Sequence, residues 1–334
     1  MNRASVRRIL RVATSVLTAA TIVLVLLHPG IVTQEVDLND GGVWVTNGNL
    51  RLVAHLNYPS QVLDSGLRTA SAEFDVDQAA ASVFVSDAAA DTYTQVDVAR
   101  TVLLAPSVGA GASSMELGGQ RVGVADPAAG QVWVMPVEDY AGFNPAATEP
   151  ALTDIPGAVL AMGTDGSVHV ASAKAGVIKT MTPAGSMDDV ATQQLPDLAE
   201  DADLQVSAVG SKTVVLDRSS STLVLPDGTA VTLTGDNLQL QIPGPEANEV
   251  LVTSAAALLR VSLSGKVTTV APTLAGGTPS RPAQHSGCAY SAWGGQGSFL
   301  RDCAGRDDDV DMAVPTLNDA TRAVFRVNRD VIVL

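Results

Sequence analysis

The sequence predicts an all-β protein, a β-propeller of about seven blades preceded by one N-terminal transmembrane helix. Three observations lead to this prediction. A short β-branched motif returns every 36 to 46 residues, and turn-forming Gly, Pro, Asn and Asp separate its copies. A single apolar run of membrane-spanning length lies near the N-terminus. Aromatic residues make up only 4% of the chain, so Val, Leu, Ala and Ile must build most of the core.

The N-terminal segment predicts export. Residues 1–11 carry four arginines and form a basic cytoplasmic tail, and residues 12–32 lack charged side chains and are long enough to cross a bilayer. Residues 33–334 are therefore expected to be extracytoplasmic, in a single-pass membrane protein held by an uncleaved signal-anchor. A cleaved signal peptide is the alternative, although small residues are missing at the cleavage positions after the apolar run. No cysteine lies nearby, which excludes a lipoprotein anchor.

The repeated motif is a triplet of the form apolar–x–apolar. Each copy is followed by a small or acidic turn and a second strand, so each unit of about 40 residues offers three or four short antiparallel strands. In "VWVTNGNLRLV" we expect Asn47 and Gly48 to supply the positive φ angles of a two-residue hairpin turn. The central residues of the triplets are Trp44, Phe84, Gly123, His169, Val215, Leu251, Tyr290 and Ile332.

A unit of this size cannot bury both of its faces alone. Arranging the units around an axis would bury the faces and leave only short edges, which is the architecture of a propeller. The seven intervals fit seven blades, and six or eight also remain open. The C-terminal "RAVFRVNRDVIVL" is expected to complete a blade that the first strands begin. A row of β-sandwich domains is the rival fold, but no boundary recurs at sandwich length.

The two cysteines, Cys288 and Cys303, are fifteen positions apart and are the only ones in the chain. In an exported protein they are expected to form a disulfide that staples one hairpin across its glycine-rich turn. Closing a loop of about 15 residues is worth roughly 3 kcal/mol. Two unpaired or intermolecular thiols are one alternative, and a catalytic thiol beside His285 is another. A metal half-site is disfavoured because CxxC spacing is absent.

The remaining residues give no catalytic, metal or cofactor signature, and we predict no cofactor. His28 lies in the predicted span, His55 and His285 are isolated, and His169 sits mid-strand, where a packed and satisfied side chain is expected. No HExxH, GxSxG or P-loop sequence occurs. Enzymatic activity is therefore left open, with a non-enzymatic role favoured.

One acidic stretch, "RDDDVDM", places Asp307, Asp309 and Asp311 at alternate positions. Carboxylates spaced in this way are candidate Ca²⁺ ligands when a turn and a distal Glu complete the shell. Neither follows here, so a solvated loop is the favoured interpretation.

One aromatic group, Trp133 with Tyr140 and Phe143, offers a candidate binding patch on a loop face. Because aromatic residues are so scarce, core packing is the competing interpretation.

The charge balance excludes one class of partner. Beyond residue 11 the chain has 16 basic and 35 acidic residues and no basic stripe. Such a surface repels nucleic acid and anionic lipid, so the predicted contact with the bilayer is through residues 12–32 only.

Several segments resemble a known group of proteins. The "RRILR" head with one span, "DGGVWVTNGNLRLVAHLNYPSQVLDSGL", "CAYSAW…LRDC" and "VFRVNRDVIVL" together are similar to the N-terminal region of large, membrane-anchored actinobacterial surface proteins. Those proteins carry fibronectin type III or other Ig-like repeats downstream. The resemblance covers essentially the whole chain and implies an extracytoplasmic propeller-like module that holds or presents adhesive repeats. Such repeats are absent from these 334 residues, which suggests a truncated product.

We therefore expect a binding or scaffold module of the cell surface, acting in adhesion or in contact with the cell envelope. Its partner is an unknown protein, glycan or cell-wall polymer. The alternative is a propeller hydrolase or lyase that acts on extracellular carbohydrate or peptide. Carboxylates converging with a histidine at one mouth of the ring would favour the enzyme, and a mouth lined with Ser, Thr and Ala would favour the binder. A sensor ectodomain is a third possibility, but the cytoplasmic tail is too short for a signalling domain.

Overall fold

The computed structural model describes residues 42–90, 92–104, 108–109, 114–183, 189–274, 276–306, 309–329 and 331–334. The predicted tail 1–11 and the predicted span 12–32 lie outside this part. In the described ranges, no helix is both long and apolar enough to cross a membrane. Residues Asn39–Leu334 form one compact unit.

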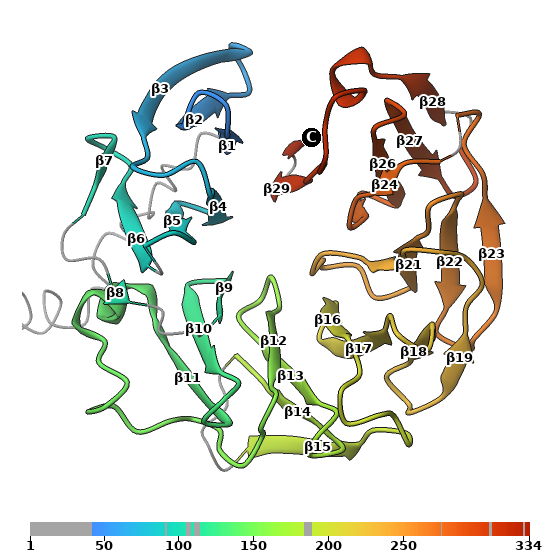
Figure 1. The fold of residues 1–334 in the computed structure, drawn as a ribbon, viewed down its shortest axis with the longest axis horizontal. Coiled ribbons are helices and arrows are strands. Elements are labelled where there is room, and N and C mark those ends of the chain that lie inside the picture. Colours follow the sequence, from blue (N-terminus) through green and yellow to red (C-terminus); the bar gives the residue numbers. More distant parts are fainter. Residues whose placement is uncertain are drawn as a thin grey trace, which may run out of the picture. The chain divides into compact units, whose positions relative to one another are not determined.

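In the described residues, seven antiparallel sheets of three to five strands follow one another along the chain, and we call them blades 1 to 7; a two-stranded sheet lies at the C-terminal end. Figure 1 shows them around a common axis, with the chain passing from one blade to its neighbour. The prediction of an all-β propeller is confirmed, and the number of blades is seven.

The strands of the first three blades have the following bounds. Blade 1 contains β1 (Val43–Asn47), β2 (Leu52–Asn57) and β3 (Val62–Arg68); blade 2 contains β4 (Phe74–Ala79), β5 (Ser82–Asp87), β6 (Thr92–Asp97), β7 (Val102–Leu103) and β8 (Val108–Gly109); blade 3 contains β9 (Ser114–Gly118), β10 (Arg121–Asp126) and β11 (Gln131–Pro136). A short 3-10 helix, η1 (Val137–Gly142), follows blade 3.

The remaining blades are more regular. Blade 4 contains β12 (Val159–Met162), β13 (Val168–Ser172), β14 (Val177–Met181) and β15 (Val190–Gln194); blade 5 contains β16 (Leu204–Val209), β17 (Lys212–Asp217), β18 (Thr222–Val224) and β19 (Ala230–Thr232); blade 6 contains β20 (Gln239–Leu240), β21 (Glu249–Thr253), β22 (Leu258–Ser262) and β23 (Val267–Val270). Blade 7 contains β24 (Thr278–Pro279), β25 (Ala283–His285), β26 (Cys288–Gly294), β27 (Ser298–Cys303) and β28 (Val310–Ala313), and η3 (Pro315–Leu317) leads to β29 (Arg326–Asn328) and β30 (Val331–Val333).

The repeated triplets all lie on strands, on β1, β5, β10, β13, β17, β21, β26 and β30. In the four-stranded blades 4 to 6 this strand is the second from the axis, with a sheet neighbour on each side. Its side chains also face the neighbouring blades, so it is buried on both faces, and β13 and β17 are buried almost throughout. This double burial explains why the second strand carries the strongest β-branched signal.

The hairpin between β1 and β2 was predicted correctly, but its turn was not. Asn47 pairs with Leu52, which leaves a four-residue loop rather than a two-residue one. Arg51, not Gly48, takes the positive φ of 51°. The side chain explains the difference, because Asn47 Oδ1 accepts a hydrogen bond from the Leu50 amide at 3.1 Å and so favours the wider turn.

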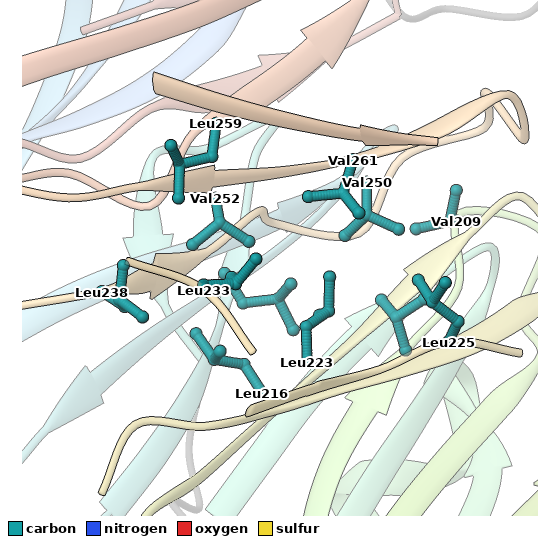
Figure 2. Packing of buried hydrophobic residues seen from close by; sticks show 12 residues of the cluster. Val209, Leu216, Leu223, Leu225, Leu233, Leu238, Val250, Val252, Leu259 and Val261 are labelled. Atoms are coloured by element: carbon teal, nitrogen blue, oxygen red, sulfur yellow. The ribbon is translucent and has the colours of Figure 1, made fainter. Parts of the chain in front are cut away.

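The cores lie mainly between blades, as Figure 2 shows for blades 5 and 6. Twelve buried aliphatic side chains from these two blades interdigitate there without an aromatic ring. Burying each of them fully contributes about 1.5–3 kcal/mol. The three tryptophans lie in other interfaces and are at most 3% exposed. The aliphatic cluster comprises Val209, Val214, Leu216, Leu223, Leu225, Leu233, Leu238, Leu240, Val250, Val252, Leu259 and Val261.

The C-terminal segment returns to the first blades, as expected, at a place that we call the seam. There β29 lies against β1 and β4, and Asn328 Nδ2 donates to the Gly42 carbonyl at 2.7 Å. The expected completion of blade 1 is only partly met, because the ladder of β29 in the described residues is with β30. Arg329, with a φ of 52°, turns the chain back within a few residues, so the two last strands pair with each other.

Candidate functional site

The innermost strands of blades 2 and 3 carry three carboxylates. On β4, Asp75 and Asp77 alternate with Val76, which is fully buried against blade 1. On β9, Glu116 alternates with Met115 in the same way. Since β4 lies beside β9 near the axis (Figure 1), these side chains share one region of the ring. The strand periodicity therefore places one residue in the core and the next on the opposite face of an innermost strand.

Asp75 joins the two ends of the folded unit. Its carboxylate accepts a hydrogen bond from Arg322 Nη2 at 2.9 Å and another from Arg326 on β29. Arg326 is the more buried of the two partners, with 19% of its side chain exposed against 70% for Arg322. The Asp75–Arg326 pair is therefore the one that contributes more to the seam.

Arg281, in the segment between β24 and β25, links the inner strands of two other blades. Its Nε donates to the Leu240 carbonyl at 3.0 Å, and its Nη2 donates to the carbonyls of Gln241 at 2.9 Å and Val206 at 3.4 Å. These carbonyls lie on or next to innermost strands, whose axial edge has no further strand to pair with. Within the described residues Nη1 has no acceptor, and burial lowers the pKa of the guanidinium.

Two of the carboxylates have strongly perturbed acidities. Burial, opposed by Arg326 and reinforced by Asp75, raises the pKa of Asp77 to about 6. Burial, reinforced by Asp77 and opposed by Arg281 and Arg326, raises the pKa of Glu116 to about 7. In the described part of the chain neither carboxylate accepts a hydrogen bond or forms an ion pair. Both therefore bear a desolvation cost that no protein group offsets by direct contact.

We call these side chains the axial cluster: Asp75, Asp77, Glu116, Arg281, Arg322 and Arg326. The cluster can bind a charged or polar ligand, and its two acids with pKa values near neutrality can exchange protons. None of the six was predicted from the sequence. The signal that could have indicated them is the alternation in "FDVDQ", where acids replace the usual apolar residues on a first strand.

His169, a candidate from the sequence, is fully buried in β13 and satisfied, as expected. Its Nε2 contacts Ser167 Oγ at 2.8 Å, and its Nδ1 contacts Thr213 Oγ1 at 2.7 Å. Thr213 in turn contacts Thr180 at 2.7 Å, and Ser167 donates to Asp165, so a polar chain joins blades 4 and 5. Burial lowers the pKa of His169 to about 4, which keeps the ring neutral. We assign a structural role to this polar chain, because Ser167 is only 1% exposed.

The other histidines lie apart from the axial cluster. His55 was expected to be isolated, but its Nδ1 contacts Asp64 Oδ1 at 2.7 Å on the neighbouring strand. The hydrogen bond from His55 holds the pKa of Asp64 below its usual value. His285 lies on β25, opposite Cys288. Consequently no described histidine accompanies the axial carboxylates.

The aromatic group forms part of the core. Trp133 and Tyr140 are each 3% exposed. Phe143 packs edge-on against Trp133, and Tyr140 packs edge-on against Phe84. Trp133 Nε1 also donates to the Thr148 carbonyl at 2.9 Å. The packing interpretation is therefore correct, and these rings form no exposed patch.

The two described candidate Ca²⁺ ligands accept hydrogen bonds from different protein groups. Asp309 Oδ1 accepts from the Cys303 amide at 2.8 Å, and Asp311 Oδ2 accepts from the amide and hydroxyl of Thr273 at 2.6 Å. Asp307 lies outside the described residues. No group of three or more His, Cys, Asp or Glu side chains in the described part of the chain is arranged to hold a metal ion.

The predicted disulfide is present. Cys288 and Cys303 are bonded and lie directly opposite each other on β26 and β27, with Cα atoms 4.1 Å apart. The bond staples the hairpin of blade 7 across the turn that contains Gly295 and Gly297, both at positive φ. It lies in the last blade before the seam, which indicates a structural role.

A buried ion-pair network between blades 6 and 7 was not predicted. Arg260, 9% exposed, donates to Glu249 in its own blade and to Asp302 in the next. Burial lowers the pKa of Arg260, but the hydrogen bonds that its guanidinium donates to these two carboxylates outweigh burial, so the pKa is raised overall. Gln284 Nε2 also donates to Glu249 at 3.3 Å. Because the pairing spans two blades, spacing along the sequence gives no sign of it.

One polar cavity, of about 190 Å³, lies where blade 5 connects to blade 6. The Arg218–Asp203 ion pair, at 2.5 Å, forms part of its wall and cancels its charge. The lining residues are Asp203, Arg218, Ser221, Gly235, Asn237 and Leu238.

No family model matches the chain, and no curated protein is significantly similar in sequence. Solved structures do show the same fold. Apo AztD from Citrobacter koseri matches with a TM-score of 0.53 at 11% identity, over 81% of this chain and 94% of its own. The dihydro-heme d1 dehydrogenase NirN, in complex with DHE, matches with a TM-score of 0.53 at 11% identity, over 84% and 62%. A catalytically inactive virginiamycin B lyase from Staphylococcus aureus, with quinupristin, matches with a TM-score of 0.51 at 12% identity, over 76% and 88%.

At such identities these likenesses establish the propeller fold alone. Their names span a lyase, a dehydrogenase and AztD, so the fold leaves the activity of this chain open.

Proposed function

We propose that this protein is a non-enzymatic binding or scaffold module of the cell surface, held outside the cytoplasm by its N-terminal anchor. Its partner is a protein, glycan or cell-wall polymer. The resemblance to the N-terminal region of membrane-anchored surface proteins supports this proposal, as do the basic head and apolar run of residues 1–32.

One observation carries the binding role. Asp77, Glu116, Arg281 and Arg326 come from four elements that are far apart in the sequence, yet each acts electrostatically on at least one of the others. Convergent polar groups with perturbed acidities are the usual mark of a ligand site. The ring brings them together at its axis, where side chains from every blade can reach one partner.

The chemistry of the cluster indicates what it binds. Asp77 and Glu116 lack a counter-ion within the described residues, so a protonated amine placed between them would offset their desolvation cost. The free Nη1 of Arg281 would donate to an acceptor on the same ligand. Amines and carbonyls occur together in peptides and in the peptide parts of cell-wall polymers, and we favour that class.

The test uses the full chain in detergent micelles and purified peptidoglycan sacculi as the probe. We expect the chain to sediment with the sacculi, and we expect Glu116→Gln and Asp77→Asn to weaken binding about tenfold each. Glu138→Gln is the matched control, since Glu138 is an exposed acid on η1. Equal binding by all variants, or no binding to sacculi or soluble muropeptides, would overturn the assignment.

The alternative is a hydrolase or lyase, and one observation supports it. A carboxyl with a pKa of about 7, such as that of Glu116, is suited to general acid–base catalysis. The same incubation distinguishes the two proposals. Release of soluble fragments that Glu116→Gln abolishes would establish the enzyme, whereas reversible binding without fragments supports the module.

Membrane attachment is tested separately. We expect the full chain to resist alkaline carbonate extraction from cell membranes and to be digested by protease added outside intact cells. Extraction into the soluble fraction would contradict the anchor.

A further inference from the structure

The exposed apolar side chains of the described residues are concentrated on two adjacent blades. Of the twelve large apolar residues that are well exposed in the described part of the chain, eight lie on blades 1 and 2. Seven of these eight flank one type of turn, the turn that leads into the outermost strand of a blade. In blade 1 this turn is 58–61, and in blade 2 it is 98–101. The seven residues are Tyr58, Val62, Leu63, Val98, Val102, Leu103 and Leu104, at 38% to 56% exposure.

These positions are topologically equivalent. The strands of neighbouring blades alternate in direction in the same order, so the turn that leads into the outermost strand lies at the same end of each blade. Figure 1 shows β3 and β7 on the outer side of their blades. The seven side chains therefore lie on the outer rim at one end of the ring, and we call them the apolar rim.

The corresponding turns of other blades are charged. Asp227 lies in that turn of blade 5, Lys266 in that of blade 6, and Arg306 in that of blade 7. By contrast, residues 57–63 and 98–104 contain one charged residue, Arg100, which pairs with the adjoining Asp97 at 3.4 Å. Asp64 and Asp97 border the rim, and the surface between them is apolar.

The order of the chain indicates what covers this rim. Blades 1 and 2 are the first to follow the predicted span, and nine residues, 33–41, connect that span to Gly42. Nine residues reach at most about 30 Å when fully extended. The length of this connection limits how far Gly42 can lie from the end of the predicted span. Tyrosine and aliphatic side chains beside a basic residue form the kind of surface that inserts into the headgroup region.

We propose that the apolar rim of blades 1 and 2 rests in the outer interface of the bilayer and orients the propeller on the membrane. This inference rests on the proposed membrane attachment. It adds a second lipid contact, beyond the anchor, and fixes which end of the ring faces away from the cell.

The experiment uses the full chain reconstituted in vesicles of zwitterionic lipid, with a protease site inserted between residues 33 and 41. After cleavage, the vesicles are sedimented and the retained propeller is measured. Val62, Val102 and Val267 each open the outermost strand of their blade and are 51%, 46% and 39% exposed. Val62→Asp and Val102→Asp change the rim, and Val267→Asp is the matched control on blade 6.

We expect the unchanged propeller to stay on the vesicles after cleavage. The double variant Val62→Asp/Val102→Asp should lower the ratio of retained to released protein about tenfold, while Val267→Asp should leave it unchanged. Circular dichroism checks folding, and substitutions at such exposed positions should leave the fold intact.

Three results would overturn the proposal: complete release of the unchanged propeller, equal loss with Val267→Asp, or a rim-dependent dimer in the absence of vesicles. A failure of the anchor is recognised separately, by carbonate extraction before cleavage. In that case, rim-dependent sedimentation of the chain with added vesicles would still support the rim, and its absence would contradict it.

Discussion

The substitution Glu116→Gln should stabilise the protein at neutral and alkaline pH and leave its stability unchanged in acid. Burial raises the pKa of Glu116 from 4.5 to about 7 in the folded protein. The folded state therefore binds the proton more tightly than the unfolded chain. The stability linked to this carboxyl is fully present below pH 4.5 and is lost as pH rises through 7. Glutamine keeps the shape of the side chain but cannot ionise.

The size of the effect follows from the two pKa values. A difference between 4.5 and about 7 corresponds to a free-energy cost of about 3 kcal/mol once the carboxylate is ionised. Judged by its solvent-exposed area, Glu116 is only half-buried, so solvent screening reduces this free-energy cost of ionisation. We therefore expect Glu116→Gln to raise the free energy of unfolding by about 1–2 kcal/mol at pH 8 and by nearly nothing at pH 4.

Denaturant unfolding followed by circular dichroism between pH 4 and pH 8 measures this difference. Glu138→Gln, at an exposed position of η1, is the control, and it should change the free energy of unfolding by the same small amount at every pH. A destabilised Glu116→Gln protein at pH 8, or a difference that does not vary with pH, would refute the reasoning. Such a result would mean that the carboxylate is already compensated at the axis.

Three further changes test other parts of the structure. Replacing Cys288 and Cys303 with serine should lower the free energy of unfolding by about 2–3 kcal/mol, and thiol titration of the unreduced, unfolded wild-type protein should find no free thiol. His169→Ala should lower the free energy of unfolding by about 2–4 kcal/mol at pH 7 and by less near pH 4. The wild-type protein itself loses stability as pH falls from 6.5 through the folded pKa of His169, which is about 4, because the folded state favours the neutral ring. Arg260→Met should destabilise by about 3–5 kcal/mol in denaturant unfolding, because it leaves Glu249 without its buried partner; a loss below about 1 kcal/mol would contradict that view.

The architecture could be predicted because its signal is local. Each second strand packs against both neighbouring blades, so every unit needs β-branched apolar residues at the same place. Phe84, Val215 and Leu251 mark this position in blades 2, 5 and 6. The disulfide was predictable for a similar reason, since two cysteines flank one glycine-rich hairpin.

The axial cluster could not be predicted from spacing. Asp75 and Arg326 are 251 positions apart and meet only because the ring closes. Arg281 depends likewise on blades 5 and 6 presenting unpaired carbonyls toward the axis. The wider turn at Asn47 was missed because a side-chain hydrogen bond overrode the usual preference of an Asn-Gly pair.

A double-mutant cycle between Asp75 and Arg326 tests ring closure most directly. Asp75→Asn and Arg326→Gln are measured singly and together by denaturant unfolding of the full chain at pH 7. The pair is partly buried, with 26% and 19% of the side chains exposed. We therefore predict a coupling free energy of about 1–2 kcal/mol. Additive effects, with a coupling below about 0.3 kcal/mol, would contradict a ring in which β29 is held against the second blade.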